Sequence, residues 1–414
     1  MSLNEWLSYI ESLHPTTIDL GLSRVKQVAN NLGITTATAK IITISGTNGK
    51  GTTVATLEAI YQAAGYHVAA YTSPHLINFD ERIRINGKNV AEATLGQAFE
   101  IIEAARGDIT LTYFEFTTLA AFWIFAQCAL QVWILEVGLG GRLDAVNIID
   151  ADVAIITNVA IDHQEWLGNN RAAIAKEKLG ITRPYTPLVY GETNPPDGFL
   201  DYVQKHNVYL YQVHQEFTFA VDHEKRTWEW RGDKHYYPDL YLPPFITLNM
   251  ACAIQAIECL QAQLPVSTKA LQQGLQQIKL TGRCQVIGEQ PWQLIDVAHN
   301  PHGSHYLAEF VSGHRPAGKI IAIFSALADK DIDGIVAPLL QLVDEWFVAG
   351  LSVSRGMTAG KIKHILNEKV TTPVYQYQHI AEAYRAALAR ATAEDGIVIF
   401  GSFHTVSEVL REQI

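Results

Sequence analysis

Apolar and polar residues along this chain follow two alternating patterns. Short runs of β-branched and apolar residues, typical of buried parallel strands, recur between longer segments with the spacing of amphipathic helices. Strands are expected at residues 41–44, 68–71, 132–137 and 153–158. Helices are expected at residues 4–13, 19–32, 52–64, 91–105, 114–129 and 171–181. Alternating strands and helices predict a mostly parallel sheet with helices on both faces.

The pattern changes twice further along the chain. Residues 208–237 show an aromatic-rich alternation that predicts antiparallel hairpins, and helices at 247–263 and 269–278 follow. After a break around residues 281–291, a second series of strands begins. These strands are expected at residues 293–297, 320–324, 345–348, 374–377 and 397–400, with helices between them.

The length of 414 residues exceeds what one hydrophobic core usually holds. We therefore expect two domains, covering residues 1–282 and 291–414, with a linker at about 283–290. An uncharged stretch at 116–135 has nearly the length of a membrane span, but it is interrupted by Thr and Gln and has no basic flank. It divides better into a buried helix and a central strand, so no membrane association is predicted.

Composition and charge narrow the classes of function. Hydrophobic residues make up 48% and charged residues 18%, which excludes a disordered chain. Thirty-one basic residues stand against 42 acidic ones, giving a net charge of −11 without a basic stripe, so a nucleic-acid partner is not expected. The four cysteines form no C-x-x-C pair, and the N-terminus lacks the features of a signal peptide, which favours a cytoplasmic protein.

One glycine loop carries the strongest chemical signal. The segment 44–53 reads Ile-Ser-Gly-Thr-Asn-Gly-Lys-Gly-Thr-Thr, in which an expected strand enters the loop and an expected helix leaves it. Backbone N–H groups of such a loop can cradle phosphate oxygens, and a lysine adds positive charge. Lys50 precedes Gly51 rather than following it, which departs from the common P-loop spacing. A tight turn that merely requires glycines is the structural alternative.

Polar residues after other expected strands are further candidates. Glu136 ends a strand just before a glycine-rich segment, where a carboxylate beside a phosphate loop suits Mg²⁺. A glutamate satisfied by backbone donors is the alternative. His163 follows another strand, although a lone histidine is more often structural. Asp296 lies near the end of the first expected strand of the second domain and His299 follows that strand, at an end where open α/β sheets bind ligands.

Several motifs in one order resemble the folylpolyglutamate synthase/dihydrofolate synthase branch of the Mur ligases. The resemblance runs over nearly the whole chain, from Thr17 to the C-terminus. Besides the glycine loop, it rests on residues 71–76 (YTSPHL), 112–115 (TYFE), 135–145 (LEVGLGGRLDA), 296–302 (DVAHNPH) and 401–406 (GSFHTV). The segments 112–115 and 401–406 favour the bifunctional form of the family.

The resemblance implies roles for particular residues. For ATP it implies Thr47, Asn48, Gly49, Lys50, Gly51, Thr52, Asn249, Arg283 and Asp296. For metal it implies Ser73, Glu136, His163 and a carbamylated Lys178. For the pteroate substrate it implies Ile18, Asp19, Thr112, Tyr113, Phe114, Glu115, Leu143, Asp144 and Ala145. Catalytic roles fall to Lys50, His299 and Lys178. From residue types alone, Lys178 would lie on a solvated helix face and Phe114 would pack in the core.

The implied fold is a P-loop parallel-sheet ATPase domain with a small antiparallel β appendage, joined to a smaller Rossmann-like C-terminal α/β domain. The implied enzyme is a cytoplasmic, monomeric, ATP-dependent ligase with two Mg²⁺ ions. It would join L-glutamate to dihydropteroate and to reduced folates through an acyl phosphate. Three alternatives stay open, namely a dihydrofolate synthase alone, a Mur-type peptidoglycan ligase, and a nucleotide-controlled binding module.

Overall fold

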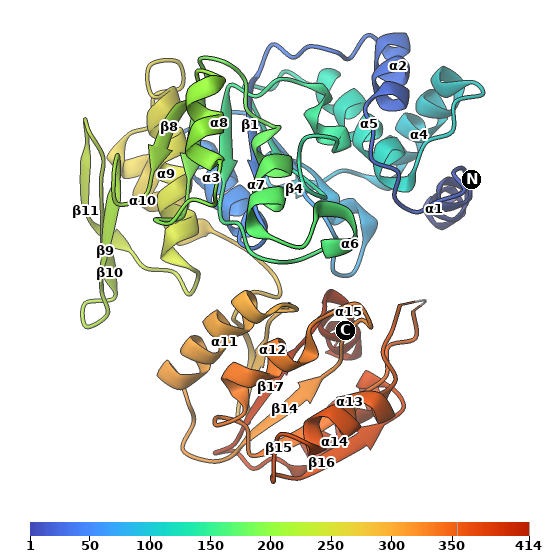
Figure 1. Ribbon diagram of the computed structural model, residues 1–414, viewed down its shortest axis with the longest axis vertical. Coiled ribbons are helices and arrows are strands. Elements are labelled where there is room, and N and C mark those ends of the chain that lie inside the picture. Colours follow the sequence, from blue (N-terminus) through green and yellow to red (C-terminus); the bar gives the residue numbers. More distant parts are fainter. Residues whose placement is uncertain (354, 414) are drawn as a thin grey trace. The chain divides into compact units, whose positions relative to one another are not determined.

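The computed structural model of the protein describes residues 1–353 and 355–413 (Figure 1). The chain divides into two compact units, Met1–Lys279 and Leu280–Ile414. Both are α/β units with mixed sheets, as expected from the alternation of strand and helix patterns.

The first unit contains an eight-stranded sheet in the order β4-β3-β2-β5-β1-β6-β7-β8. Six neighbouring strands, from β2 to β8 in this order, run parallel, while β3 and β4 form an antiparallel edge. The strands are β1 (Lys40–Ser45), β2 (Val68–Tyr71), β3 (Ile83–Ile85), β4 (Lys88–Asn89), β5 (Val132–Glu136), β6 (Val153–Ile156), β7 (Pro187–Tyr190) and β8 (Tyr209–Gln212). The central strands β5 and β6 are fully buried, and β1 is buried except at Lys40, which explains their continuous apolar runs.

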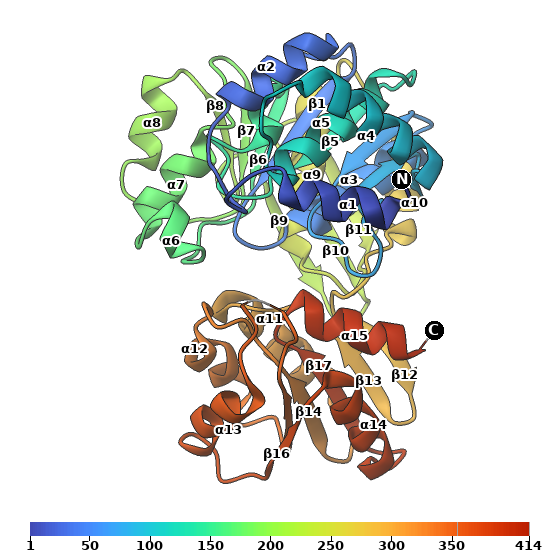
Figure 2. The ribbon, with the colours of Figure 1, turned by 90° about the vertical axis from the view of Figure 1, so that its right-hand side faces the viewer.

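Helices cover both faces of this sheet. One face carries α3 (Lys50–Ala63), α9 (Thr247–Leu260) and α10 (Thr268–Gln277), which share one apolar core. The other face carries two further groups of helices (Figure 2). The first group is α1 (Leu3–Ser12), α2 (Ser23–Leu32), α4 (Glu92–Arg106) and α5 (Tyr113–Ala126), and the second is α6 (Gln164–Leu167), α7 (Arg171–Leu179) and α8 (Phe199–Lys205). Short 3₁₀ helices η1 (Phe79–Arg82) and η2 (Ala145–Ile148) lie in the loops.

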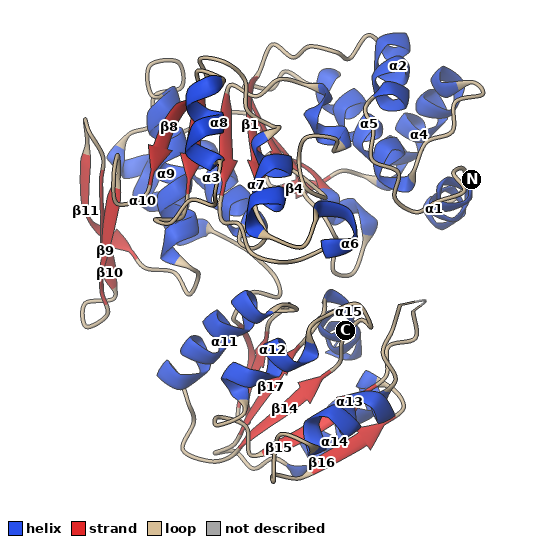
Figure 3. Cartoon of the chain, viewed as in Figure 1, coloured by secondary structure: helices blue, strands red, loops and turns tan. Residues whose placement is uncertain are grey.

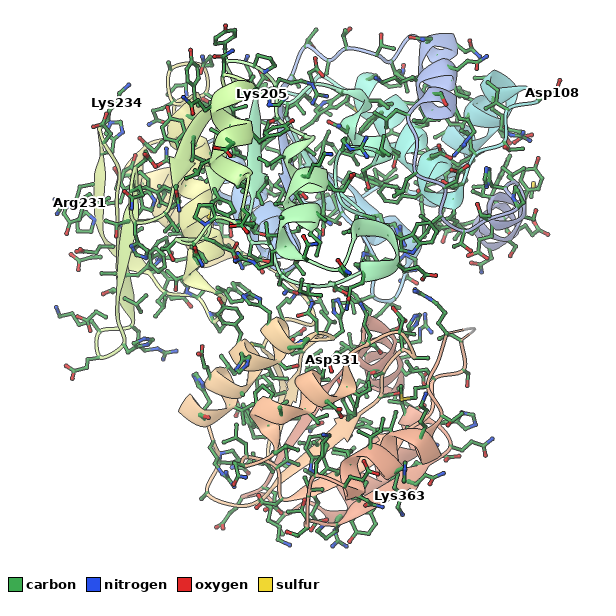
Figure 4. The ribbon with its side chains drawn as sticks, in the orientation of Figure 1. Asp108, Lys205, Arg231, Lys234, Asp331 and Lys363 are labelled. Atoms are coloured by element: carbon green, nitrogen blue, oxygen red, sulfur yellow. The ribbon has the colours of Figure 1, made fainter. Side chains whose placement is uncertain are left out.

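A separate three-stranded antiparallel sheet confirms the expected β appendage. It consists of β9 (Thr218–Asp222), β10 (Thr227–Arg231) and β11 (Tyr236–Tyr241), and its aromatic side chains pack into the core with α9. Charged side chains such as Arg231 and Lys234 point away from the unit (Figure 4). The prediction of hairpins from residue 208 onward was wrong at its start, because β8 joins the large sheet parallel to β7.

The second unit contains a six-stranded sheet in the order β12-β13-β17-β14-β15-β16. β12 runs antiparallel to β13, and the other neighbouring strands are parallel, among them β14, β15, β16 and β17, which are drawn in red in Figure 3. The strands are β12 (Gln285–Glu289), β13 (Trp292–Ile295), β14 (Ile320–Phe324), β15 (Glu345–Ala349), β16 (Val374–Tyr377) and β17 (Gly396–Phe400). The segment expected to be a linker, about residues 283–290, therefore contains a strand that pairs with β13 in a hairpin.

Two groups of helices lie on opposite sides of the second sheet (Figure 2). One group is α11 (Pro301–Gly313), α12 (Ile332–Val336), η3 (Ala337–Leu339) and α13 (Ala359–Asn367), and the other is α14 (Ile380–Arg390) and α15 (Phe403–Gln413). The chain leaves β14 toward α12 and β17 toward α15, so the two loops turn to opposite faces. Such a point, at the carboxyl ends of parallel strands, is where open α/β sheets bind ligands. No helix in residues 1–353 or 355–413 is long and apolar enough to cross a bilayer.

Candidate active site

The glycine loop between β1 and α3 is held by the segment that follows β6. The N–H of Thr47 donates to the carbonyl of Asn158 at 3.1 Å, and the N–H of Asn48 donates to the Asn158 side chain at 3.0 Å. Gly46 has a φ of 149°, and a Cβ there would lie 1.8 Å from Thr157 Oγ1. Only glycine fits such a conformation at so close an approach. The loop is therefore a fixed turn at the carboxyl end of the central strand.

Lys50 begins α3 and bends back over the loop. Its Nζ donates to the carbonyls of Gly46 at 2.9 Å and Thr47 at 3.3 Å. The N-terminus of this 14-residue helix adds the positive end of the helix dipole at the same place. The structure thus gathers positive charge where the sequence predicted a phosphate site.

Asn249 reaches the same loop from α9. Its side chain is buried, with 2% of the residue exposed, and a Cβ on Gly49 would stand 2.3 Å from its Oδ1. Its Nδ2 is buried and has no hydrogen-bond partner. A buried donor left unpaired costs roughly 1–3 kcal/mol, so such groups usually mark a ligand or a strained site. An acceptor such as a phosphate oxygen at the loop would satisfy Asn249.

Two of the expected metal ligands meet at the ends of β2 and β5. Glu136 is buried at the end of β5, and its Oε2 accepts a hydrogen bond from the N–H of Ser73 at 3.3 Å. The glycine loop follows the neighbouring strand β1 and so lies at the same carboxyl end of the sheet. There, Ser45 Oγ donates to the carbonyl of Gly140 at 2.7 Å. An oxygen-rich pair beside a phosphate loop fits a hard divalent cation.

Lys178 lies in α7 and is buried, not solvated as residue type alone suggested. Burial, together with the nearby charge of Lys50, lowers the pKa of Lys178 to about 7, against the opposing effect of Asp162 and Glu192. Its amine is thus partly neutral near pH 7. A neutral amine is what the addition of CO₂ requires.

His163 precedes α6 and is exposed, with a φ of 49°. The His163 side chain makes no hydrogen bond that caps α6, and the backbone N–H of His163 donates to Asp162 Oδ1 at 2.8 Å. Among the described residues, no three His, Cys, Asp or Glu side chains group as a ready metal cluster. The expected set contains only two such residues, Glu136 and His163. To bind a cation, this set would also need oxygen donors from Ser73 and from a modified Lys178.

An aromatic and an acidic side chain, Phe114 and Asp144, lie beside the segment that follows Glu136. Phe114, at the start of α5, packs against Gly138, where an added Cβ would lie 2.6 Å from the Phe114 ring. The ring centroids of Phe114 and Tyr71 are 5.9 Å apart. Asp144 is buried, and burial raises its pKa to about 6 even though the N–H groups of Leu139 and Val146 bind it. The neighbouring Leu143 is half-buried and Ala145 is buried.

The other residues expected to bind pteroate take part in a local hydrogen-bond network. Thr112 and Glu115 form a capping box at the N-terminus of α5, so part of their hydrogen-bonding capacity is structural. Arg24 of α2 bridges Glu115, at 3.1 Å, and Asp19, at 2.6 Å. Ile18, beside Asp19, is half-buried. The network brings the segment before α2 to the start of α5, where Tyr113 and Phe114 also lie.

The second unit holds its own candidates at the ends of β13 and β17. Asp296 is buried and accepts hydrogen bonds from the N–H groups of Cys284 at 2.8 Å and Ala298 at 2.7 Å. Burial raises the pKa of Asp296, partly opposed by Arg283. Arg283 lies 5.1 Å from the ring centroid of Phe403, and His299 packs near the same ring. The structure thus gathers these predicted residues within one unit.

Some residues of the site escaped the sequence analysis. Thr157 and Asn158 hold the glycine loop, Arg24 ties two expected pocket carboxylates together, and Phe403 joins Arg283 to His299. Thr157 and Asn158 end an expected strand, so their position was a usable signal. The pairing of Arg24 with Glu115 spans 91 residues and leaves no local trace.

Family models match both units. The Mur ligase middle domain matches residues 44–235, and the Mur ligase glutamate ligase domain matches residues 282–403. The dihydrofolate synthase/folylpolyglutamate synthase of Escherichia coli K12 is 44% identical over 411 residues, covering 99% of this chain and 95% of that protein. The counterpart from Haemophilus influenzae is 37% identical over 431 residues, covering 98% of this chain and 96% of that protein.

Two solved structures are similar to this chain over its whole length. Escherichia coli FolC in complex with DHPP and ADP superposes with a TM-score of 0.95 at 42% identity, covering 100% of this chain and 98% of that one. A bifunctional folylpolyglutamate synthase/dihydrofolate synthase from Yersinia pestis, complexed with AMPPNP and Mn ion, gives 0.93 at 43% identity, covering 100% and 98%. The chain belongs to the dihydrofolate synthase/folylpolyglutamate synthase family of Mur ligases.

Proposed function

We propose that this protein joins L-glutamate to dihydropteroate, giving dihydrofolate, and to reduced folates, giving folylpolyglutamates, with ATP as co-substrate. It is an ATP-dependent, amide-forming ligase. One observation carries the proposal for the site. The glycine loop follows β1, Glu136 ends the adjacent strand β5, and Phe114 packs beside Gly138 in the segment that comes next.

The reaction must turn a poor electrophile into a good one. A carboxylate resists attack by an amine, so the γ-phosphoryl group of ATP is transferred to it first, and the glutamate amine then displaces phosphate from the acyl phosphate. Transfer of this kind depends on positioning and on charge stabilisation rather than on a protein nucleophile. We assign the charge stabilisation to Lys50, to the amide of Asn249 and to the N–H groups at the N-terminus of α3.

A divalent cation belongs to this proposal, and relatives contain Mn ion with AMPPNP. Ser73, Glu136, His163 and a carbamylated Lys178 would hold it, and two Mg²⁺ ions are the form that we propose. Bound there, the cation would neutralise charge on phosphate oxygens. The buried amine of Lys178, whose pKa is lowered to about 7, supports the modification.

The pocket between α5 and the segment 138–145 would bind the pterin. The ring of Phe114 offers a flat apolar surface for a flat heterocycle, and the carboxylate of Asp144 can accept hydrogen bonds from amino and ring N–H groups. Ile18, Asp19, Tyr113 and the capped Thr112–Glu115 segment would complete the pocket. In the second unit, we assign phosphate contact to Arg283 and Asp296, and a role in the reaction to His299.

The test is ADP release by the purified protein with ATP, Mg²⁺ and L-glutamate. Dihydropteroate and tetrahydrofolate should each stimulate it, and each product should carry an added glutamate. Release with dihydropteroate alone would reduce the function to a dihydrofolate synthase. Release with a nucleotide-sugar peptide precursor and none with folates would favour a peptidoglycan ligase. A monomeric state and a cytoplasmic location stay predictions from the sequence.

A further inference from the structure

Arg82, the last residue of η1, is a buried cation in the first unit. Only 8% of the residue is exposed. Its guanidinium lies 5.7 Å from the ring centroid of Phe79 and 5.4 Å from that of Tyr113. Its Nε donates to His75 Nδ1 at 2.8 Å. Two aromatic rings and a histidine thus fix the direction in which the terminal nitrogens point.

Those terminal nitrogens have no partner in the described protein. Neither Nη atom donates a hydrogen bond to residues 1–353 or 355–413, and Arg82 makes no ion pair there. Neither is among the fully enclosed unpaired atoms, so both reach solvent-accessible space. A buried charge is costly unless it is paired, and a guanidinium presents its paired donors to carboxylates in a fixed fork.

Arg84, two residues further on, shows the usual arrangement by contrast. Its guanidinium pairs with Glu58, the closest N–O distance being 2.8 Å, and also donates to Thr72 Oγ1 at 3.0 Å and to the carbonyl of Glu81 at 2.7 Å. One arginine of the pair is therefore satisfied by protein groups. The other is held rigidly and left open.

The open arginine borders the proposed pteroate pocket. Tyr113, which covers its guanidinium, is the neighbour of Phe114 in the first turn of α5. The carbonyl of Arg82 accepts the N–H of Thr72, so Arg82 also sits beside the segment that carries Ser73. Arg82 therefore lies between the aromatic end of the pocket and the segment with the expected metal ligands.

We propose that Arg82 binds a carboxylate of the pterin-bearing substrate, and so fixes the end of the molecule that reacts. This inference rests on the proposed function and adds to it a residue that the sequence motifs did not assign. In dihydropteroate the carboxylate is the benzoate group itself. In a folate it belongs to the glutamate. Both offer the same planar pair of oxygens to the guanidinium fork.

The experiment measures dissociation constants by calorimetry for wild-type protein, Arg82→Gln and Arg82→Lys. Three probes are used: dihydropteroate, tetrahydrofolate, and 6-hydroxymethyl-7,8-dihydropterin, which keeps the ring and lacks a carboxylate. ATP binding is measured alongside. Arg84→Lys is the matched control, because Arg84 lies in the same segment and its charge is already paired.

Arg82→Gln should weaken the two carboxylate-bearing probes by roughly ten- to a hundredfold, the range for a hydrogen bond to a charged group. Binding of hydroxymethyl-dihydropterin and ATP should stay within about twofold. Loss for only one carboxylate probe would identify which carboxylate is bound. Arg82→Lys keeps the charge without the fork and should give a smaller loss; it carries the test if Arg82→Gln does not fold.

Equal weakening of all three probes would make Arg82 a structural residue and overturn the proposal, as would unchanged binding of both carboxylate probes. If the wild-type protein binds none of the probes, the proposed function itself fails, and the assignment of Arg82 falls with it. The two failures are therefore distinguishable.

Discussion

The side chain of Asn249 lies so close to Gly49 that a Cβ on the glycine would stand 2.3 Å from Oδ1 of the asparagine. The two residues are 200 positions apart, and their approach puts a buried, unpaired amide nitrogen at the phosphate loop. The glycine loop thus contacts a side chain of α9, a helix that lies about 200 residues after β1 in the sequence.

Replacing Asn249 by alanine should weaken the binding of ATP. The lost donor would have served a charged phosphate oxygen, and such a bond contributes about 1.5–3 kcal/mol, so the ATP Kd should rise roughly ten- to a hundredfold. Nucleotide titration of the purified variant measures it. Gln255→Ala is the control, because it removes another buried amide from the same helix. Equal effects of both variants would mean that the helix, not the amide, was disturbed.

Replacing Lys50 by alanine should nearly abolish turnover while the protein stays folded. Removing one charge stabiliser typically costs on the order of 10²–10³ in rate. Steady-state ADP release and the unfolding midpoint measure the two parts of this prediction. Lys176→Ala, which removes an exposed lysine from α7, is the control and should keep its activity. A Lys50 variant that turned over normally would contradict the phosphate-loop assignment.

Buried runs made much of the fold predictable. The ranges expected for β2 and β14 agree with the structure, since apolar β-branched runs mark central parallel strands. The two-residue β4 and the hairpin strand β12 were missed, because their residues carry no such run. The direction of β8 was wrong for another reason. Alternation along one strand shows which side chains are buried, and it does not reveal whether the neighbour runs parallel.

The site was predictable where its residues were adjacent in sequence. The glycine loop and the strand-end position of Glu136 could be predicted from local patterns, and the structure places both at the carboxyl ends of adjacent strands. The burial of Lys178 did not follow, because its segment reads as a polar helix and only tertiary packing encloses it. The open guanidinium of Arg82 was invisible for the same reason.

Binding of the pterin substrate should depend on pH through Asp144. Burial raises the pKa of Asp144 to about 6, so the carboxyl is ionised above this pH and protonated below it. Only the ionised group accepts hydrogen bonds with both oxygens. Dihydropteroate affinity should therefore fall as the pH is lowered through about 6, measured with the pterin's own titration subtracted.

Asp144→Asn supplies the comparison for this pH effect. The variant should bind dihydropteroate more weakly at pH 8 and should lose the step near pH 6, while its ATP affinity changes little. A step of the same size in the variant would assign the titration to another group.

Carbamylation of Lys178 should be needed for full activity. The amine of an unmodified lysine would be a cation beside a divalent metal, whereas a carbamate offers anionic oxygens. Lys178→Ala should lose most activity and recover part of it with a short carboxylate such as acetate. Electron density at Lys178 in a metal-loaded crystal supplies a readout that does not depend on activity. A bare ammonium there, or full activity of the variant, would refute the modification.

The position of β1 in its sheet determines how late in translation this strand can pair with its neighbours. Its two neighbours, β5 and β6, begin at residues 132 and 153, and the segment that holds the glycine loop follows at residues 157–160. While the ribosome makes the chain, nearly 90 further residues must therefore be added after β1 before it can pair with a neighbour on either side. A nascent chain shorter than about 160 residues would have the whole glycine motif and no means of holding it in shape. The nascent chain should thus become able to bind ATP late in translation, long after the glycine motif itself has been made.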